Sequence, residues 1–294
     1  MNKLVLTSGA TNAPNNDRDA ARHVSTTRAM TRRFIPLLWT WVFIPLLFLS
    51  CITIKPLFST CENKSDPASK LYAELVLSAT PNTLAKKEKK AGWQLLFDGK
   101  TADGWRGYNM QKAPDVWTIE DGCLVMNSEG GNERQDIMTD GVYRDFAFTV
   151  EYKMSKGSNS GIIYQIKEDP KYQRPHFTGP EIQLIDHDNF PVELAGWQIN
   201  GAIVGMYAPK AKPHHPFGEW NHLLLVVKGN HVTIMLNGVE IIRYEKYSEE
   251  WNELYNIGRM SRFPDFAKFD EGHISLQYYG SGNLWFRNIK IKLL

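Results

Sequence analysis

Residues 146–154 alternate strictly between two kinds of side chain, and this period most constrains what the chain can fold into. Successive residues of a strand point to opposite faces, so a period of two predicts a β-strand with distinct faces. One face holds Phe146, Phe148, Val150, Tyr152 and Met154. The other holds Ala147, Thr149, Glu151 and Lys153. We therefore expect sheet structure, since no long segment shows the helical period.

Turn-forming residues separate the other strands that we expect from Gly92 onward. Gly229-Asn230 and Asn237-Gly238 favour positive φ, as tight hairpin turns require. The predicted strands are 161–167, 181–186, 223–228, 231–236, 239–244, 273–279 and 284–294. Short strands at regular spacing with such turns are typical of a β-sandwich or jelly roll. The predicted fold class is therefore all-β.

The net charge of +2 over 294 residues limits the partners of the chain. Binding to nucleic acid needs a concentrated basic surface, so we expect no nucleic-acid partner. The twelve Tyr and nine Trp residues suit a sheet core and also stacking on sugar rings. Of the three cysteines only Cys123 lies in the expected folded domain, which excludes a disulfide scaffold there.

A basic pair followed by an apolar run is typical of an export signal. The run 34–50 follows Arg33, and its length is near the roughly 17–25 residues of a membrane-spanning helix. We interpret residues 30–61 as a lipoprotein signal lipidated at Cys51 or Cys61. The alternative is an uncleaved membrane anchor.

Both alternatives place the folded domain outside the cytoplasm, in the cell envelope, as a periplasmic or outer-membrane lipoprotein or an anchored protein. Residues 1–29 are then an over-extended start or a disordered tail. We interpret residues 62–91 as a linker, with a short helix within 71–77 and a solvated or headgroup-binding charge run at 86–90. The folded domain is expected over 92–294.

An ordered series of short motifs runs through this domain. It comprises Gly92-Trp93-Gln94-Leu95-Leu96-Phe97-Asp98-Gly99-Lys100, Gly104-Trp105, Trp117-Thr118-Ile119-Glu120-Asp121-Gly122, Asn159-Ser160-Gly161, Thr178-Gly179-Pro180-Glu181-Ile182-Gln183-Leu184-Ile185-Asp186, Gly218-Glu219-Trp220-Asn221 and Trp285-Phe286-Arg287-Asn288-Ile289. The series resembles the 3-keto-disaccharide hydrolase family. The resemblance implies a concanavalin A-like sandwich, an extracytoplasmic location, and cleavage of glycosides whose C3 hydroxyl has been oxidised to a ketone.

One segment departs from the family pattern. Members of the family usually read Leu-Gln-Asp-His-Gly near the end, whereas this chain has Tyr278 and Tyr279 in place of the Asp and the His. Two functions therefore stay open. The chain is a glycoside-cleaving enzyme, or it is a lectin-like sandwich that binds sugars without cleaving them. A structural envelope protein is a third alternative.

A 3-keto sugar can be cleaved through its acidic C2 proton. A base removes this proton, the C1 substituent leaves by β-elimination, and water addition completes a net hydrolysis. The route needs a base near C2, hydrogen-bond donors at the C3 oxygen and an acid near the glycosidic oxygen. A divalent cation could serve at the C2 and C3 oxygens.

Glu181, Asp186 and His187 are the densest group of carboxylates and imidazole in the expected domain. We predict Glu181 as the base or as a metal ligand, His187 as a second candidate base and Asp186 as a third catalytic residue. Glu181 and Asp186 are also the candidate ligands of a divalent cation. The alternative is that Glu181 and Gln183 are ordinary outward-facing residues of one strand.

Other polar and aromatic residues are candidates for binding the sugar. They are Glu151, Asn159, Gln183, Trp197, Gln277, Tyr279 and Arg287. Several have a structural alternative: a salt bridge for Glu151, turn formation for Asn159, an ion pair for Arg287 and core packing for Trp197. We interpret His214-His215 as an exposed loop, because no third ligand lies at a typical metal-binding spacing.

Overall fold

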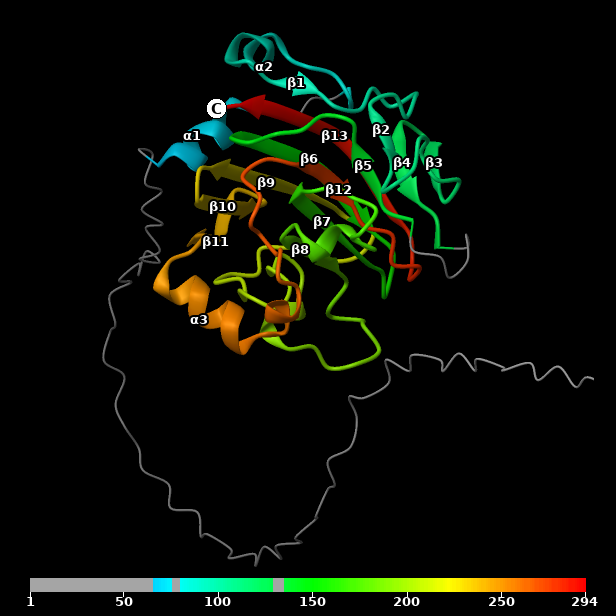
Figure 1. Ribbon diagram of the computed structural model, residues 1–294. Helices are drawn as coiled ribbons and strands as arrows, with labels where there is room; N and C mark the ends of the chain where they lie inside the picture. The colour runs from blue at the N-terminus through cyan, green and yellow to red at the C-terminus, as the bar shows by residue number, and fades with distance from the viewer. Residues whose placement is uncertain (1–65, 76–79, 129–134) are drawn as a thin grey trace, which may run out of the picture. The chain divides into compact units, whose positions relative to one another are not determined.

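The computed structural model describes residues 66–75, 80–128 and 135–294. The expected signal or anchor, both candidate lipidation cysteines and residues 1–29 lie outside these ranges. In Figure 1 two antiparallel sheets lie one over the other. Their facing sides meet in one apolar core, which confirms the predicted all-β sandwich. No helix in the described ranges is long and apolar enough to cross a membrane.

The larger sheet has eight strands, and the last strand of the chain lies in its middle. Its order is β11-β10-β9-β6-β13-β4-β3, and β1 also pairs with β13. The bounds are β1 Gln94–Leu95, β3 Trp117–Glu120, β4 Cys123–Met126, β6 Phe146–Met154, β9 Trp220–Lys228, β10 His231–Leu236, β11 Val239–Glu245 and β13 Leu284–Leu293.

The second sheet has five strands, in the order β2-β5-β12-β7-β8. The bounds are β2 Trp105–Gly107, β5 Ile137–Thr139, β7 Asn159–Ile166, β8 Glu181–Ile185 and β12 His273–Leu276. The helices are α1 Pro67–Glu74, α2 Lys86–Ala91 and α3 Glu249–Ile257, with short 3-10 turns at Pro175–Phe177, Gly196–Gln198 and Arg259–Arg262.

The predicted hairpins form at the two predicted turns. β9 and β10 pair from Lys228 and His231 outward, on either side of Gly229-Asn230. β10 and β11 turn at Asn237-Gly238, where both residues have positive φ. The local turn chemistry therefore fixes the register of three strands of the large sheet.

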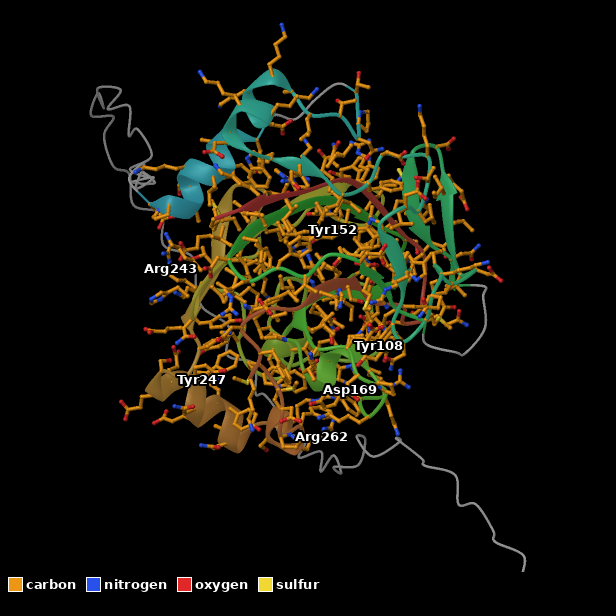
Figure 2. All side chains as sticks on the ribbon, turned by 45° about the horizontal axis from the view of Figure 1, so that its top comes forward. Tyr108, Tyr152, Asp169, Arg243, Tyr247 and Arg262 are labelled. Atoms are coloured by element: carbon orange, nitrogen blue, oxygen red, sulfur yellow. The ribbon has the colours of Figure 1, made fainter. Side chains whose placement is uncertain are left out.

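The apolar face of β6 enters the core as its alternation predicts. Phe146, Phe148, Val150 and Tyr152 are fully buried, and Figure 2 shows Tyr152 between the two sheets. Full burial of an aromatic or aliphatic side chain contributes roughly 1.5–3 kcal/mol to stability. The Tyr152 hydroxyl accepts a hydrogen bond from Asn200 Nδ2 at 2.9 Å, so its polar end is satisfied inside the core.

Helices α1 and α2 pack on the outer side of the large sheet. Ala68 and Leu71, one helical turn apart, form a second apolar cluster with Leu224 and Met235 of that sheet. The expectation of a linker over 62–91 is therefore wrong for the described residues 66–75 and 80–91. The reason is that an apolar stripe of only two or three residues is enough to attach so short a helix.

The charge run of α2 is not wholly solvated either. Glu88 is fully buried and pairs with Lys290 of β13, at 2.7 Å between Nζ and Oε1. Its second oxygen accepts the N–H of Ala85 at 2.8 Å and so caps the helix. Removing one partner of such a buried pair is destabilising by about 3–5 kcal/mol, because the other charge stays behind.

His222 of β9 joins α1 to the sheet. Thr149 Oγ1 donates to the Leu223 carbonyl at 2.9 Å, so it must accept the Nε2–H of His222, which lies 2.7 Å away. The Tyr72 hydroxyl then donates to Nδ1 at 3.1 Å. This arrangement needs a neutral imidazole, and burial lowers the pKa of His222 to about 4.

We expect the domain to lose stability as pH falls from 6.5 towards 4, because unfolding lets His222 bind a proton that the folded state excludes. The stabilisation is complete above the unfolded pKa of 6.5 and amounts to about 3 kcal/mol, lost by about pH 4. Urea unfolding at a series of pH values would measure it. His222→Gln should flatten this part of the curve, whereas the exposed-histidine control His231→Gln should leave it unchanged. Equal slopes for the wild type and His222→Gln would contradict the assignment.

Candidate active site

The outer face of the five-stranded sheet carries a continuous row of side chains. Glu181 pairs with Ile163, Ile163 with Ser275, Ser275 with Met138, and Met138 with Arg106. Residues in register share one face of a sheet. The next row, formed by Ile182, Ile162, Leu276 and Ile137, belongs to the core. The row that holds Glu181 therefore faces away from the core.

Glu181 lies at the centre of a polar group on this face. A Cβ atom on Gly161 would stand 2.5 Å from Glu181 Oε1, so the carboxyl group lies over the bare backbone of β7. Gln183 is the cross-strand neighbour of Gly161. The Gln277 N–H donates to the Gly161 carbonyl at 2.8 Å from the other side. The carboxyl group of Glu181 thus lies over Gly161, and the backbones of Gln183 and Gln277 flank the same glycine on its two sides.

These polar side chains form the floor of the face. Glu181, Gln183 and Gln277 are each at most 8% exposed. Asn159, at the start of β7, is similarly buried, and its Oδ1 has no hydrogen-bond partner among the described residues. Buried side-chain oxygens are normally paired, so an acceptor without a partner suits a ligand-binding position.

A further segment holds the free edge of β8 in place. The Gln183 N–H donates to the Ala202 carbonyl at 2.9 Å, and the Val204 N–H donates to the Glu181 carbonyl at 3.0 Å. The backbone that carries Glu181 is therefore hydrogen-bonded on both edges. This fixes the position of its side chain relative to β7.

Asp186 and His187 are not brought together with Glu181. Asp186 lies five positions after Glu181 along an extended chain, a distance of about 16 Å at 3.3 Å per residue. Asp186 instead accepts hydrogen bonds from Gly157 N at 2.8 Å and Asn189 Nδ2 at 3.1 Å, which holds the adjoining turns. Glu181 and Asp186 therefore do not fit a shared metal ion.

Glu151 and Arg287 lie on the other sheet. Glu151 Oε2 accepts from Arg287 Nε at 2.7 Å, and its Oε1 accepts from Asn288 Nδ2 at 2.9 Å. The guanidinium carbon of Arg287 lies 3.8 Å from the centre of the Trp220 ring. Glu151 and Arg287 thus form an ion pair with each other, which is the structural alternative to sugar binding for both residues. The pair lies on a different sheet from Glu181.

The two tyrosines of the departing segment have different environments. Tyr278 is buried in the core and its N–H donates to Asp136 Oδ1 at 2.8 Å. Tyr279 follows β12 and is 40% exposed. Trp197 is half-buried in a loop, with the Arg259 guanidinium 5.7 Å from its ring. Tyr279 and Trp197 therefore keep surface that a sugar can contact.

Comparison with known proteins identifies the family. The profile described as a 3-keto-alpha-glucoside-1,2-lyase-like domain matches residues 92–292. The chain belongs to this family. A curated 3-keto-disaccharide hydrolase of Bacteroides thetaiotaomicron is 31% identical over 275 residues, which cover 84% of this chain and 94% of the relative.

Solved structures agree with this assignment. A Parabacteroides distasonis protein classed as a glycosyl hydrolase superposes with a TM-score of 0.69 and 36% identity, over 73% of this chain and all of the other. A second protein of that organism, classed alike, gives 0.52 and 26% over 69% of this chain and 99% of the other. Membership of the 3-keto-glucoside family thus places the chain among the enzymes that act on glycosidic bonds.

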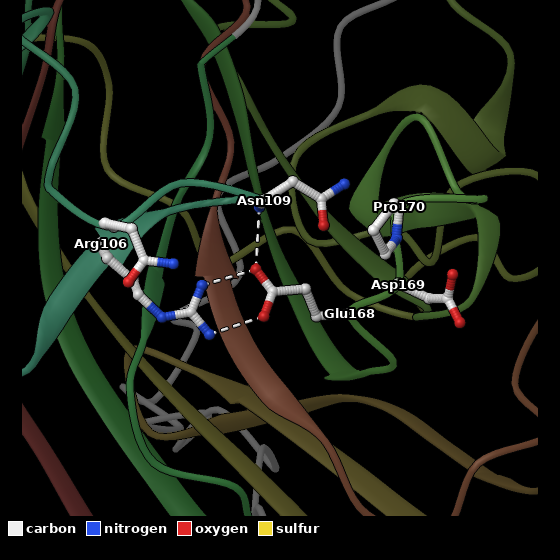
Figure 3. A pocket seen from close by; sticks show the side chains of 6 residues that line it. Arg106, Asn109, Glu168, Asp169 and Pro170 are labelled. Atoms are coloured by element: carbon white, nitrogen blue, oxygen red, sulfur yellow. Dashed lines mark hydrogen bonds and ion pairs between the residues drawn. The ribbon is translucent and has the colours of Figure 1, made fainter.

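A second polar pocket lies at the other edge of the same sheet, and sequence reasoning missed it. Figure 3 shows Arg106 of β2 facing Glu168, which follows β7. Arg106 Nη2 donates to Glu168 Oε2 at 2.7 Å in a two-pronged pair. The pocket measures about 400 Å³ and is lined by Arg106, Asn109, Gln111, Glu168, Asp169 and Pro170. No local motif could reveal it, because its two halves come from distant segments.

Arg106 is the one cationic side chain among the residues that line this pocket, and it pairs with two carboxylates. The Arg106 guanidinium lowers the pKa of Glu168, which therefore stays ionised. Arg106 also lies 3.2 Å from Asp140, measured from Nε to Oδ1. A carboxylate held in this way is a poor proton donor, so the pocket suits binding of hydroxyl groups and not acid catalysis.

We expect Gly161→Ala to displace the Glu181 carboxyl group and to reduce activity by about 100-fold, the loss typical of a 1 Å misplacement. Gly161 has no positive φ, so alanine fits its backbone and the domain should stay folded. Initial rates with a 3-keto-disaccharide and thermal unfolding would measure both effects. Gly196→Ala is the control, since its added Cβ would meet only Ala208 at 3.2 Å. A Gly161→Ala enzyme with wild-type rates would show that this contact does not position Glu181.

Proposed function

We propose that the chain cleaves 3-keto-glycosides, in particular 3-keto-disaccharides, with Glu181 as the base that removes the C2 proton. The observation that carries the proposal is the Glu181 carboxyl group over Gly161, whose neighbours on the two sides are Gln183 and Gln277. The name of the Bacteroides relative, a 3-keto-disaccharide hydrolase, supports the substrate class.

The chemistry follows from the ketone. The Glu181 carboxylate takes the C2 proton, and the electron pair of that bond moves onto the C3 oxygen to give an enediolate. The electron pair then returns and expels the C1 substituent, which leaves with a proton from an acid. The product is a 2-hydroxy enone with a C1–C2 double bond. Water added across this bond gives net hydrolysis.

A lyase and a hydrolase share the steps from proton removal to the enone. The two activities differ only in whether the enone leaves the site before water adds at C1. The family description contains the word lyase and the name of the relative contains the word hydrolase. Glu181 has the same role in either outcome, so the proposal covers both.

The neighbouring amides supply what the enediolate needs. Gln183 and Gln277 carry NH₂ groups on the face that holds Glu181, and donors aimed at a developing oxyanion stabilise it. Tyr279 offers an O–H group or a ring face at the end of β12. We propose that Tyr279 contacts the part of the substrate that is attached at C1. In the sequence it stands where other members of the family have a histidine.

No step of this route uses a metal ion. The two carboxylates first considered as ligands, Glu181 and Asp186, lie at opposite ends of β8, and Asp186 already accepts two hydrogen bonds. The acidity of the C2 proton comes from the ketone itself. A base and two amide donors are sufficient groups for its removal.

We also propose that the enzyme works in the cell envelope, held there by a lipid on Cys51 or Cys61 or by an uncleaved anchor. The proposal rests on the basic pair and the apolar run before these cysteines. A soluble disaccharide is a substrate that an envelope enzyme can meet.

We expect Glu181→Gln to lower turnover of the 3-keto-disaccharide by roughly 10²–10⁴-fold, since proton transfer by a positioned side chain contributes that much. Glu151→Gln is the matched control. Both carboxyl groups are 7% exposed and each lies on the outer side of a sheet. The control should cost stability, because Arg287 loses its partner, and it should leave the rate of the folded enzyme within about twofold. Initial rates of the purified full chain, with the unoxidised disaccharide as inert comparison, would measure this.

Two results would refute the base assignment. One is equal loss of rate in Glu181→Gln and Glu151→Gln. The other is tight binding of the 3-keto-disaccharide by the wild type without turnover, with or without chelator, which would indicate a binding protein. Trapping the enone during turnover would separate a lyase from a hydrolase, because only a lyase releases it.

We expect fatty-acid labelling in a bacterial host to mark the chain at one of the two candidate cysteines. Cys51→Ser should abolish the label if that residue is lipidated, and Cys61→Ser should then leave it intact, or the reverse. Mass spectrometry of the amino-terminal peptide would give the modified residue. Labelling that survives in the double variant would refute lipidation at both, and an unlabelled but membrane-bound chain would indicate the anchor.

A further inference from the structure

Two histidines and an aspartate come together beyond the end of β8. His187 and Asp188 follow that strand, and His214 comes from the loop that leads to β9. One ligand atom from each lies within 4.8 Å of the other two. The sequence spacing around His214-His215 indicates no third ligand, and only the fold brings His187 and Asp188 next to His214. The fold supplies the partners that the sequence spacing does not.

The distances are close to those that a metal ion requires. His214 Nε2 lies 3.1 Å from Asp188 Oδ2, and His187 Nε2 lies 3.7 Å from Asp188 Oδ1. Ligand atoms bound at about 2.0–2.1 Å around a tetrahedral zinc ion are about 3.4 Å apart. Small side-chain shifts would bring all three atoms to that spacing.

His187 gives an independent indication of a ligand. Its side chain is only 9% exposed, and its Nδ1, the nitrogen that does not face Asp188, is buried without a hydrogen-bond partner in the described part of the chain. Its ring centre lies 4.5 Å from that of His214. A buried nitrogen without a partner is costly unless something binds it, so either nitrogen of this ring is available to a cation.

We propose that His187, Asp188 and His214 bind one divalent cation of the zinc class. Two imidazole nitrogens and one carboxylate oxygen suit Zn²⁺ and similar ions, and oxygen-seeking ions such as Mg²⁺ and Ca²⁺ prefer other sets. Three protein ligands leave room for water.

The ion would join the two halves of the sandwich. His187 and Asp188 continue a strand of the five-stranded sheet, and His214 precedes β9 of the large sheet. The site lies beyond Ile185, whereas Glu181 begins the same strand. The bound ion therefore clamps two loops together and does not touch the reacting sugar. The inference is independent of the proposed reaction.

Titration of the metal-stripped, tag-free full chain with ZnCl₂ would test the site. We expect one equivalent of Zn²⁺ to bind these residues and to raise the melting temperature. X-ray absorption should show two imidazoles and one carboxylate around zinc. His214→Ala and His187→Ala should each weaken this binding by more than the roughly 10–100-fold that loss of a supporting hydrogen bond costs a metal site.

His215→Ala is the matched control, because His215 is not part of the cluster and its Nδ1 lies 2.8 Å from the Trp220 carbonyl oxygen. It should retain the wild-type affinity for Zn²⁺. Glu181→Gln should also retain it, which keeps this test separate from that of the catalytic base. The proposal is overturned if zinc fails to bind the wild type, or binds His187→Ala, His214→Ala and the wild type alike.

Discussion

Each of the two sheets has an inner and an outer side, and the alternation of side chains along every strand decides which residues lie on each. The positions of the helices and of the candidate site depend on what the two outer sides carry. The inner sides of both sheets are apolar and meet in one core. The outer side of the large sheet is covered by α1 and α2, which bring their own apolar residues and a buried ion pair. The outer side of the five-stranded sheet carries the Glu181 row instead. One sheet is thus stabilised by its cover, and the other carries polar side chains on the face where we propose the sugar binds.

The polar face depends on small features of the backbone. Gly161 leaves the space in which the Glu181 carboxyl group lies, and Gln277 bonds to the carbonyl of the same glycine. Residues 201–204 hold β8 from its other edge. Such a site is preorganised by main-chain hydrogen bonds, which suits a base that must meet one particular C–H bond.

Local patterns were sufficient to predict five strands of the large sheet, β6, β9, β10, β11 and β13, and the short strands β1, β3 and β4 were missed. The alternation in β6 gave its inner face, and Gly229-Asn230 and Asn237-Gly238 gave two hairpins, because turn geometry depends on only a few neighbouring residues. The same reasoning missed α3, whose single fully buried residue, Trp251, leaves no helical period in the sequence. It also predicted a linker where α1 and α2 dock, since docking depends on a surface that the sequence does not display.

The candidate site was only partly predictable for a related reason. Glu181 and Gln183 share a face because they are two residues apart, and this parity is visible in the sequence. Gln277 approaches Gly161, and Arg106 meets Glu168, only because β12 and β2 join the same sheet. Asp186 and His187 are close to Glu181 in sequence, but an extended strand separates them in space. Proximity along a strand is a poor guide to a shared site.

The place of β13 has a consequence for the order of folding. This strand comes after every other strand of the sandwich in sequence, yet it lies between β6 and β4 and bonds to both. The large sheet therefore cannot close until residues 284–293 have been synthesised. Pairings between strands so distant in sequence are slow to form. A nascent chain should thus remain unclosed until then, and loss of residues 284–293 would leave β6 with an open edge in the middle of the sandwich.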